Sequence, residues 1–307
     1  MEQKRILAFG NPVFDIIMTP VVNRKDRVLS GCSTNACLAA SKLGVPSFLV
    51  GTVGLDLHDR LEQELDQWGI GHQLHPSEQT GGFSLLYDES GNRELTVLGI
   101  ADAIPANADG ITDAGFILLG PILGEIPVEL VKNIKERTNA PILLDPQGLL
   151  RSVKDGQVRH ELTDAFVAIA RLSTVIKANE LETQVVTGIN PREDPQAAVK
   201  ALHDFGCQIA VVTLAEAGSI IYNGQDYYPI PPFTTHAIDP TGAGDTYAAG
   251  FMIRSLEAPG DMSAIGCFAS AVASIMVENS GPDFKLTRTE VDGRANSLLN
   301  GQLDLKL

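Results

Sequence analysis

A turn at residues 239–246 (DPTGAGDT) combines glycines and carboxylates in a way that could support phosphate chemistry. Pro240 ends the preceding strand, the two glycines permit unusual backbone dihedrals, and a helical pattern begins directly afterwards. The turn therefore becomes a helix N-terminus, where unpaired amides and the helix dipole form an anion hole. Asp245 lies in that first turn, where its carboxylate can orient and deprotonate an acceptor hydroxyl. The alternative is that Asp245 only caps the helix.

The elements that must position this turn follow an alternating pattern. Short β-rich runs alternate with amphipathic helical stretches along most of the chain. Because parallel strands need crossover helices, this alternation predicts a mostly parallel sheet covered on both faces, which is an α/β core. The expected strands are 6–9, 47–53, 116–119, 142–145, 174–177 and 209–213, and the expected helices are 35–43, 56–68, 128–138, 180–187 and 195–205.

Two stretches depart from this alternation. Residues 13–29 and 82–100, the second with a turn at 88–92, alternate with period two and predict a small β flap inserted into the core. His72 and His75 are expected in a surface loop and have no metal-binding pattern. The last third of the chain is expected to be helical. The expected C-terminal helices are 244–257, 262–278 and 287–300.

Composition limits the classes of partner. The 307 residues include 44% hydrophobic residues, which excludes a disordered chain. The formal net charge of −15 predicts repulsion from nucleic acid and from anionic membranes. An anionic small ligand would need local backbone amides or a bound cation to offset this acidic field.

The sequence also limits location and redox chemistry. No apolar run approaches the ~18 to 20 residues that span a bilayer, and residues 1–9 lack the apolar core of a signal peptide. These features predict a cytoplasmic chain. Its four cysteines share no C-x-x-C spacing, so we expect reduced, structural thiols rather than a disulfide or zinc framework. They are Cys32, Cys37, Cys207 and Cys267.

The segment 239–246 as a whole resembles the second signature of the ribokinase (PfkB) family of carbohydrate kinases, and the resemblance covers nearly the full chain. Residues 51–56 (GTVGLD) are similar to that family's V-G-x-D turn. The resemblance implies a ribokinase-like three-layer α/β/α core with a mostly parallel sheet and a small β lid. It implies one kinase domain over residues 1–307, with lid segments at about 12–30 and 82–100.

The substrate side of the resemblance lies near the N-terminus. Residues 10–15 (GNPVFD) resemble the family's first strand, whose aspartate, here Asp15, binds substrate hydroxyls. Residues 30–35 (SGCSTN) resemble the segment that cradles the substrate, which implies roles for Gly31 and Asn35. From the residues alone, Asp15 could be a surface acid and Asn35 could be a helix cap.

The donor side lies further along the chain. KANELE matches the family's N-x-x-E motif, which implies that Asn179 and Glu182 organise magnesium through its waters, although the same spacing is that of a capping box. A monovalent cation such as K⁺ near Asp239 and Thr241 is a further implication. The resemblance places the nucleotide at Asn179, Thr213, Gly218, Gly242, Gly244, Ser270 and Ala273.

The implied activity is transfer of the γ-phosphoryl group of ATP to a hydroxyl of a sugar, nucleoside or cyclic polyol. Asp245 would act as the base and would also contact the substrate, with the amides of Gly242, Ala243 and Gly244 as the anion hole. Residues 145–151 (DPQGLLR) look more like members that phosphorylate inositol, which favours a cyclic polyol. A homodimer is a further candidate assembly; lids of related proteins sometimes pair between subunits, but the flap expected here is small for that.

Departures from the family pattern keep alternatives open. Ser30 and Ala215 replace glycines, which would hinder close approach of a ligand wherever φ must be positive. They motivate a second hypothesis, a non-catalytic binding or regulatory protein on the same fold. Arg151 either contacts substrate or lies in a solvated turn. An NAD-dependent oxidoreductase is excluded, because the first strand lacks a G-x-G-x-x-G turn.

Overall fold

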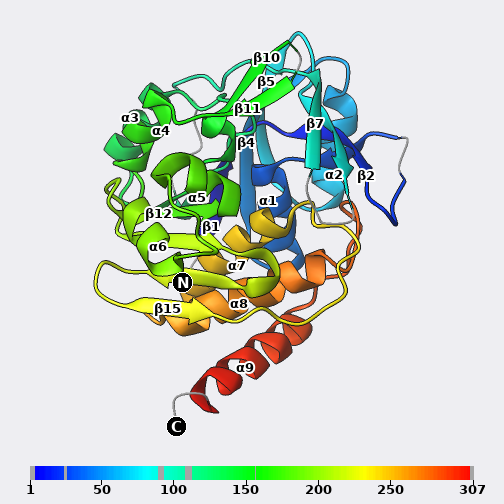
Figure 1. Cartoon of the computed structure of the whole chain (residues 1–307). Helices are drawn as coiled ribbons and strands as arrows, with labels where there is room; N and C mark the ends of the chain where they lie inside the picture. Colours follow the sequence, from blue (N-terminus) through cyan, green and yellow to red (C-terminus); the bar gives the residue numbers. More distant parts are fainter. Residues whose placement is uncertain (1–3, 24–25, 89–92, 108–112, 156, 305–307) are drawn as a thin grey trace.

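A nine-stranded sheet forms the centre of the structure, a computed structural model that describes residues 4–23, 26–88, 93–107, 113–155 and 157–304 (Figure 1). The strand order is β15-β14-β13-β12-β9-β8-β1-β4-β5. The strands from β13 to β5 run parallel, and β14 and β15 are antiparallel. They are β1 (Arg5–Phe9), β4 (Ser47–Gly54), β5 (Gly71–Ser77), β8 (Ala114–Leu119), β9 (Ile142–Leu144), β12 (Val175–Asn179), β13 (Ile209–Thr213), β14 (Ser219–Tyr222) and β15 (Tyr227–Ile230).

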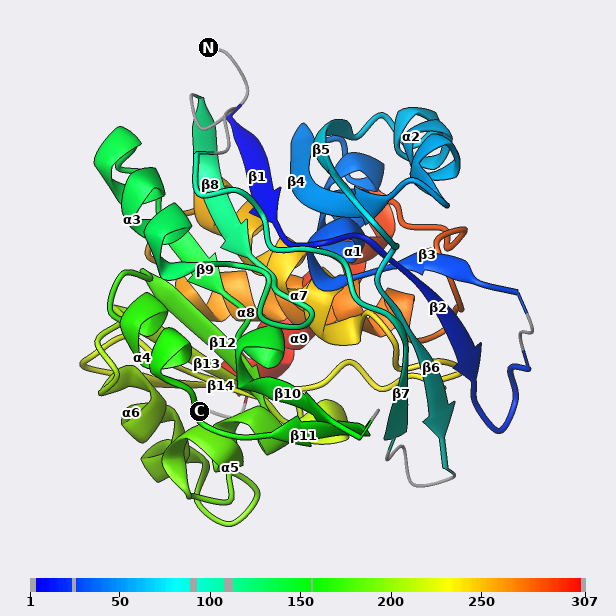
Figure 2. The same cartoon turned by 90° about the horizontal axis from the view of Figure 1, so that it is seen from above.

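Both faces of the sheet are covered, so strand residues are buried on both sides. Successive residues of β1 alternate between two apolar cores: Ile6 and Ala8 enter one, and Leu7 and Phe9 enter the other. This confirms the predicted three-layer α/β/α core (Figure 2). The helices of the first core are α1 (Cys32–Lys42), α2 (His58–Gln67), α7 (Ala243–Glu257), α8 (Met262–Met276) and α9 (Arg288–Asp304); those of the second are α3 (Val128–Arg137), α4 (Asp164–Ala170), α5 (Glu180–Thr187) and α6 (Pro195–His203).

A second, mostly antiparallel sheet forms the lid, in the order β10-β11-β7-β6-β2-β3. Alternate apolar residues such as Phe83 and Tyr87 pack with Cys32 and Ile122 into a third apolar cluster. The two expected flap segments supply four of these strands, and residues 89–92 of the expected turn lie outside the described residues. The lid strands are β2 (Val13–Met18), β3 (Val28–Ser30), β6 (Gly82–Tyr87), β7 (Arg93–Gly99), β10 (Arg151–Lys154) and β11 (Gln157–His160).

One expectation about local structure is wrong, and one hairpin was not expected. His72 and His75 lie in β5, an edge strand of the main sheet, rather than in a loop. The hairpin of β10 and β11 extends the lid sheet, although the sequence pattern did not separate it from the core. Across the described ranges, no helix combines the length and apolarity that a membrane crossing requires.

The parallel strands all end at one edge of the central sheet. Asp145 follows β9 directly, while Asn179 and Thr213 close the neighbouring strands β12 and β13. In open α/β sheets, ligands bind in the crevice outside these carboxyl ends. The fold therefore gathers the residues expected to carry the chemistry at one place.

Candidate active site

Helix α7 begins at Ala243, and its N-cap is Gly242, whose φ of 82° is in the left-handed region that glycine adopts readily. The amide of Ala243 donates to the Pro240 carbonyl at 3.2 Å, so it is engaged within the turn. The amides of Gly244 and Asp245 have no carbonyl one turn earlier in the helix. These two amides, with the positive end of the helix dipole behind them, are the donors suited to an anion.

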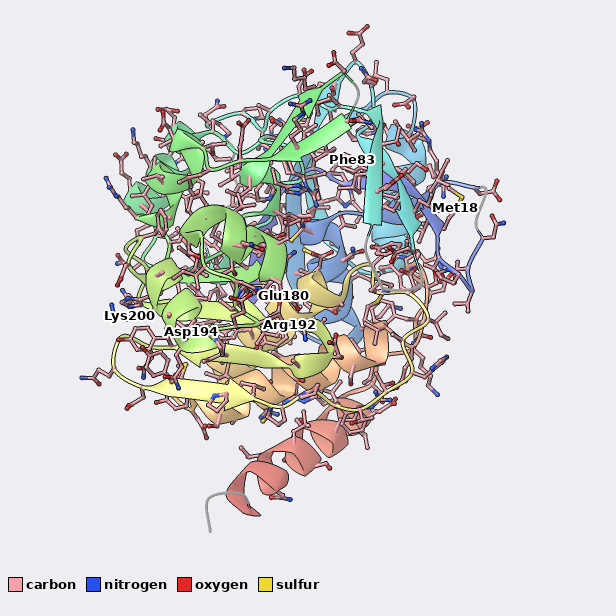
Figure 3. All side chains as sticks on the ribbon, viewed as in Figure 1. Met18, Phe83, Glu180, Arg192, Asp194 and Lys200 are labelled. Carbon is pink, nitrogen blue, oxygen red and sulfur yellow. The ribbon has the colours of Figure 1, made fainter. Side chains whose placement is uncertain are left out.

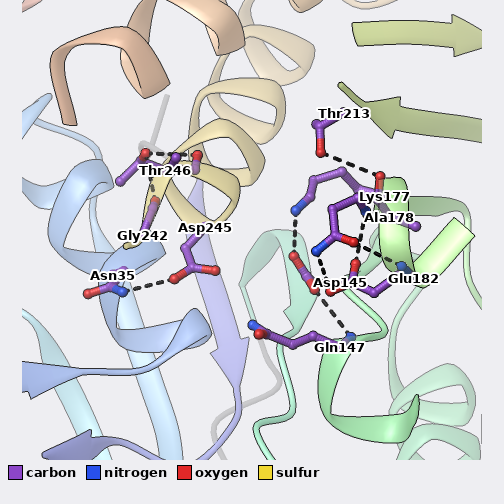
Figure 4. Close-up of polar contacts among 12 residues, drawn as sticks. Asn35, Asp145, Gln147, Lys177, Ala178, Glu182, Thr213, Gly242, Asp245 and Thr246 are labelled. Atoms are coloured by element: carbon purple, nitrogen blue, oxygen red, sulfur yellow. Dashed lines mark hydrogen bonds and ion pairs between the residues drawn. The ribbon is translucent and has the colours of Figure 1, made fainter. Parts of the chain in front are cut away.

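Asp245 occupies the first turn of α7 but makes no capping hydrogen bond, so the capping alternative is wrong. Its Oδ2 instead accepts a hydrogen bond of 2.8 Å from Nδ2 of Asn35 (Figure 4). Asn35 lies within α1, whose N-cap is Gly31, so Asn35 is not a cap either. Asp245 is half-buried, so it is not sealed inside the core.

The surroundings of Asp245 favour its protonated form. Its carboxylate, that of Asp145 and the Sγ of Cys32 have ligand atoms within 4.8 Å of one another. Burial raises the pKa of Asp245 and the Asp145 charge adds to the rise, whereas the hydrogen bond from Asn35 lowers it. A carboxylate with a raised pKa is a stronger proton acceptor than an ordinary surface aspartate.

A buried ion pair stands opposite Asp245 (Figure 4). The Nζ of Lys177, on β12, lies 2.6 Å from Oδ2 of Asp145, and both side chains are at most 4% exposed. Burial lowers the pKa of Lys177, but the Asp145 and Glu182 carboxylates raise it by more, so it stays charged. Neither residue was assigned a role from the sequence, although Asp145 begins the segment DPQGLLR and Lys177 begins the segment KANELE.

Asn179 and Glu182 form the capping box of α5. The Glu182 carboxylate accepts from the Asn179 backbone amide at 2.9 Å and from its Nδ2 at 2.8 Å, and Oδ1 of Asn179 accepts from the Glu182 amide at 2.9 Å. The capping interpretation is therefore correct. Each oxygen of the Glu182 carboxylate can still accept a further hydrogen bond, for example from a magnesium-bound water.

Replacing Glu182 by glutamine is expected to flatten the pH dependence of stability. Burial raises the pKa of Glu182 to about 7, with Asp145 adding to the rise, so the folded state holds this proton more tightly than the unfolded chain. This contribution to stability is complete below the ordinary glutamate pKa and is lost as the pH rises through about 7. Between about pH 5 and 8, the wild-type free energy of unfolding should fall by about 1–3 kcal/mol more than that of the variant. Denaturant titrations at several pH values measure this difference, and parallel curves would contradict it.

Two of the expected substrate residues, Asp15 and Gly31, lie on or next to lid strands. Asp15 is buried, and its Oδ1 accepts a hydrogen bond of 2.7 Å from the Phe83 amide of β6, so it is not a surface acid. Gly31 has a φ of 113°, and a Cβ there would lie 3.1 Å from the Asn11 carbonyl. Nearby, a small open pocket is lined by residues that include Asn11, Phe83 and Glu125.

Arg151 is buried, so the solvated-turn alternative is wrong. Its Nη1 donates to the Ile122 carbonyl at 3.1 Å and its Nη2 to Oε1 of Gln147 at 2.8 Å. Its guanidinium also lies over the Phe83 ring, 5.7 Å from the centroid. Because Ile122 and Phe83 both line the pocket, Arg151 supports the pocket wall.

The residues expected on the nucleotide side are divided among the ends of β12 and β13, the turn before β14, the start of α7 and helix α8. The Thr213 hydroxyl donates to the Ala178 carbonyl at 3.5 Å, and the Ser270 hydroxyl to the Pro231 carbonyl at 3.1 Å. Ala273 packs, partly buried, against the first core. Gly218 has a packing reason to be glycine, because a Cβ there would lie 2.2 Å from the carbonyl oxygen of Ile230.

The two departures from glycine differ in their consequences. Ala215 adopts a φ of 46°, so this chain keeps a left-handed conformation despite the side chain. Ser30 lies in β3 and is not among the residues with positive φ. Glu216, next to Ala215, forms an ion pair with Arg192. Arg192 also pairs with Glu180, with 2.7 Å between its Nη2 and Oε1 of Glu180 (Figure 3). These exposed pairs connect the loop to α5 with modest energy.

The proposed cation residues are tied to each other and to the lid. Asp239 is fully buried; its Oδ1 accepts from the Thr241 amide at 2.9 Å and its Oδ2 from the Ser280 hydroxyl at 2.7 Å. The Thr241 hydroxyl also lies 3.0 Å from the Tyr87 hydroxyl of β6. The lid is therefore in direct contact with the turn that starts α7.

Comparison with known proteins identifies the family. The family model described as pfkB family carbohydrate kinase matches residues 19–289. The chain belongs to this family. A ribokinase of Arabidopsis thaliana is 28% identical over 270 residues, which cover 82% of this chain and 67% of that protein. A cytidine kinase of Thermococcus kodakarensis is 28% identical over 260 residues, which cover 80% of this chain and 87% of that protein.

Solved structures confirm the ribokinase-like fold of this pfkB-family chain. The sulfate complex of a pyrophosphate-dependent kinase in the ribokinase family matches with a TM-score of 0.79 at 20% identity, covering 94% of this chain and 99% of that chain. Arabidopsis thaliana ribokinase complexed with ribose and ATP matches with a TM-score of 0.75 at 22% identity, covering 95% and 98%. As a pfkB-family member, the protein is a phosphotransferase with an alcohol group as acceptor.

Proposed function

We propose that this chain is a single-domain kinase that transfers the γ-phosphoryl group of ATP to a hydroxyl of a small polyhydroxylated compound. The observation that carries the proposal is the position of Asp245. Its half-buried carboxylate lies in the first turn of α7, is oriented by Asn35, and has its pKa raised by burial and by Asp145. A base and a set of anion-binding amides thus share one helix turn.

In the proposed reaction, the acceptor hydroxyl attacks the terminal phosphorus and forms a new O–P bond. The bond from that phosphorus to the donor's bridging oxygen breaks, and its electron pair stays on the leaving phosphate. The hydroxyl proton passes to Asp245, while the amides at Gly244 and Asp245 offset charge on the transferring group. Asn35 keeps the carboxylate aimed at the acceptor through its hydrogen bond of 2.8 Å.

The donor set at this edge of the sheet suits magnesium. Carboxylate and amide oxygens are the ligands that Mg²⁺ prefers, and it usually keeps several of its waters. Asn179 and Glu182 would hold those waters, and Asp239 and Thr241 are the proposed surroundings of a monovalent cation. When bound, Mg²⁺ neutralises part of the donor's phosphate charge, which matters in a chain of net charge −15.

For the acceptor, we propose a cyclic polyol. Each ring hydroxyl is both a donor and an acceptor, so it suits polar side chains such as Asp15, Asn35 and the buried Arg151. The residues DPQGLLR that supply Gln147 and Arg151 carry the resemblance to inositol-phosphorylating members. A homodimer and a cytoplasmic location stay predictions.

A combined binding and turnover screen tests this proposal. Sugars, nucleosides and inositols are added with magnesium and either ATP or pyrophosphate, and thermal shift is followed by phosphate-transfer assays. A true acceptor at about 100 times its Kd should stabilise the fold by about 2.7 kcal/mol and should be phosphorylated. Phosphorylation of an inositol with ATP is the expected result. If phosphate is transferred from pyrophosphate but not from ATP, the proposed donor is wrong. If only nucleosides are phosphorylated, the proposed acceptor class is wrong.

A further inference from the structure

The ammonium of Lys177 lies against the start of α7. A methyl group added at Gly244 would lie 2.9 Å from its Nζ, so no side chain separates the lysine from the first-turn amides. The approach spans 67 residues of sequence and depends on β12 ending where α7 begins. Lys177 thus faces the same space as the anion-binding amides.

The position of this cation is unusual for a residue that only stabilises the fold. Removing an ammonium from water costs several kcal/mol, and replacing a buried ion pair by apolar residues is often neutral or stabilising. The side chain of Lys177 is nevertheless 4% exposed. An ammonium has three donors, and within the described residues Asp145 accepts its one hydrogen bond.

The carboxylates around Lys177 would repel the phosphate of a bound donor unless a cation lay between them. Asp145, Glu182 and Asp245 all act electrostatically in this cluster, and Lys177 lowers the pKa of both Glu182 and Asp245. A phosphoryl group at the amides of Gly244 and Asp245 would bring further negative charge close to these carboxylates. A fixed positive charge beside those amides would offset it in a site that excludes water.

We propose that Lys177 is a catalytic residue whose ammonium contacts the terminal phosphoryl group of the donor during transfer, and that Asp145 is the counter-ion with which it pairs before the donor binds. The inference rests on the proposed function. Lys177 donates hydrogen bonds to the phosphoryl oxygens while the O–P bond to the acceptor forms and the donor's bridging bond breaks; the proton still passes to Asp245. The same contact serves ATP or pyrophosphate, since both present a terminal phosphate.

Three variants separate this role from a structural one: Lys177→Met, Asp145→Asn and the double variant. Calorimetry measures binding of magnesium imidodiphosphate and of a non-hydrolysable ATP analogue, and steady-state assays give kcat and the acceptor KM. Lys177→Met and the double variant should bind both probes about tenfold or more weakly and lose about 10²-fold in kcat, with the acceptor KM little changed. Asp145→Asn should bind the probes as tightly as wild type or more tightly, because its ammonium has lost a competing anion.

The outcomes are distinguishable. The double variant removes both members of the ion pair and so leaves no unpaired Asp145 charge; it decides the question if Lys177→Met fails to fold. Wild-type probe affinity and kcat in the folded double variant would overturn the proposal, as would equal losses of probe binding in Asp145→Asn and Lys177→Met. If wild type binds the probes but phosphorylates no acceptor, the proposed function fails, and the binding measurements still decide whether Lys177 contacts the phosphate.

Discussion

Replacing Asp245 by asparagine is expected to lower kcat by ~10² or more, the usual range for the loss of a general base. The amide has the shape of the carboxylate, and its oxygen can still accept the hydrogen bond from Asn35. Because burial raises the pKa of Asp245, its charge does not favour the folded state. The variant should therefore be at least as stable as wild type at neutral pH, with the difference disappearing as wild type is protonated.

Stopped assays of phosphate transfer and thermal unfolding of both proteins measure these two effects. The matched control is Asp226→Asn, since Asp226 is an exposed aspartate on the β14–β15 turn. It should leave kcat and stability unchanged. In wild type, the acid limb of kcat/KM should lie above the ordinary aspartate pKa, because the raised pKa of Asp245 controls it. Unchanged turnover in Asp245→Asn would show that another group accepts the proton.

Replacing Gly242 by alanine is expected to lower kcat by ~10- to 100-fold and to destabilise the fold by about 1–2 kcal/mol. Gly242 has a φ of 82°, where a side chain is strained. Its new methyl group would also lie 3.2 Å from Nδ2 of Asn35, the atom that orients Asp245. One substitution thus disturbs both the anion-binding turn and the base.

Gly293→Ala is the matched control for this change. Gly293 is exposed within α9, and a Cβ there would have no neighbour within 4 Å. Helix propensity predicts that this control gains up to about 1 kcal/mol in stability and keeps its kcat. A Gly242→Ala protein with wild-type kcat would mean that the turn does not position the reacting groups.

The sequence was informative where function depends on local backbone chemistry. Glycines and a proline before a helical pattern predicted the start of α7, and the structure begins that helix at Ala243 with Gly242 as its N-cap. The alternation of strands and helices predicted the sheet because parallel strands need crossovers. The Asn-x-x-Glu spacing predicted a capping box, which the structure contains.

The sequence did not predict contacts between distant residues that depend on how strands and helices are arranged in space. Asn35 and Asp245 are 210 residues apart, and the contact between them depends on the packing of α1 against α7. Lys177 meets Asp145 because β12 and β9 are neighbours in the sheet, an order that periodicity does not specify. No pairwise pattern in the sequence signals either contact.

Short or polar strands were missed for a different physical reason. β5 lies at the edge of the sheet, half exposed, and contains His72, Gln73 and His75, so it lacks the apolar run of a central strand. β10 and β11 are four residues each, and pairing of β11 with β7 joins them to the lid sheet. The burial of Arg151 follows from that hairpin, which is why its sequence context left two alternatives open.

The most direct test of the central claim is ³¹P NMR of a reaction mixture with magnesium, ATP and an inositol, followed with wild type and with Asp245→Asn at equal concentration. The account predicts that a phosphomonoester resonance grows with wild type as the γ-phosphate resonance declines, and that its growth is ~10²-fold slower with the variant. Equal rates of phosphomonoester formation by the two proteins would contradict it.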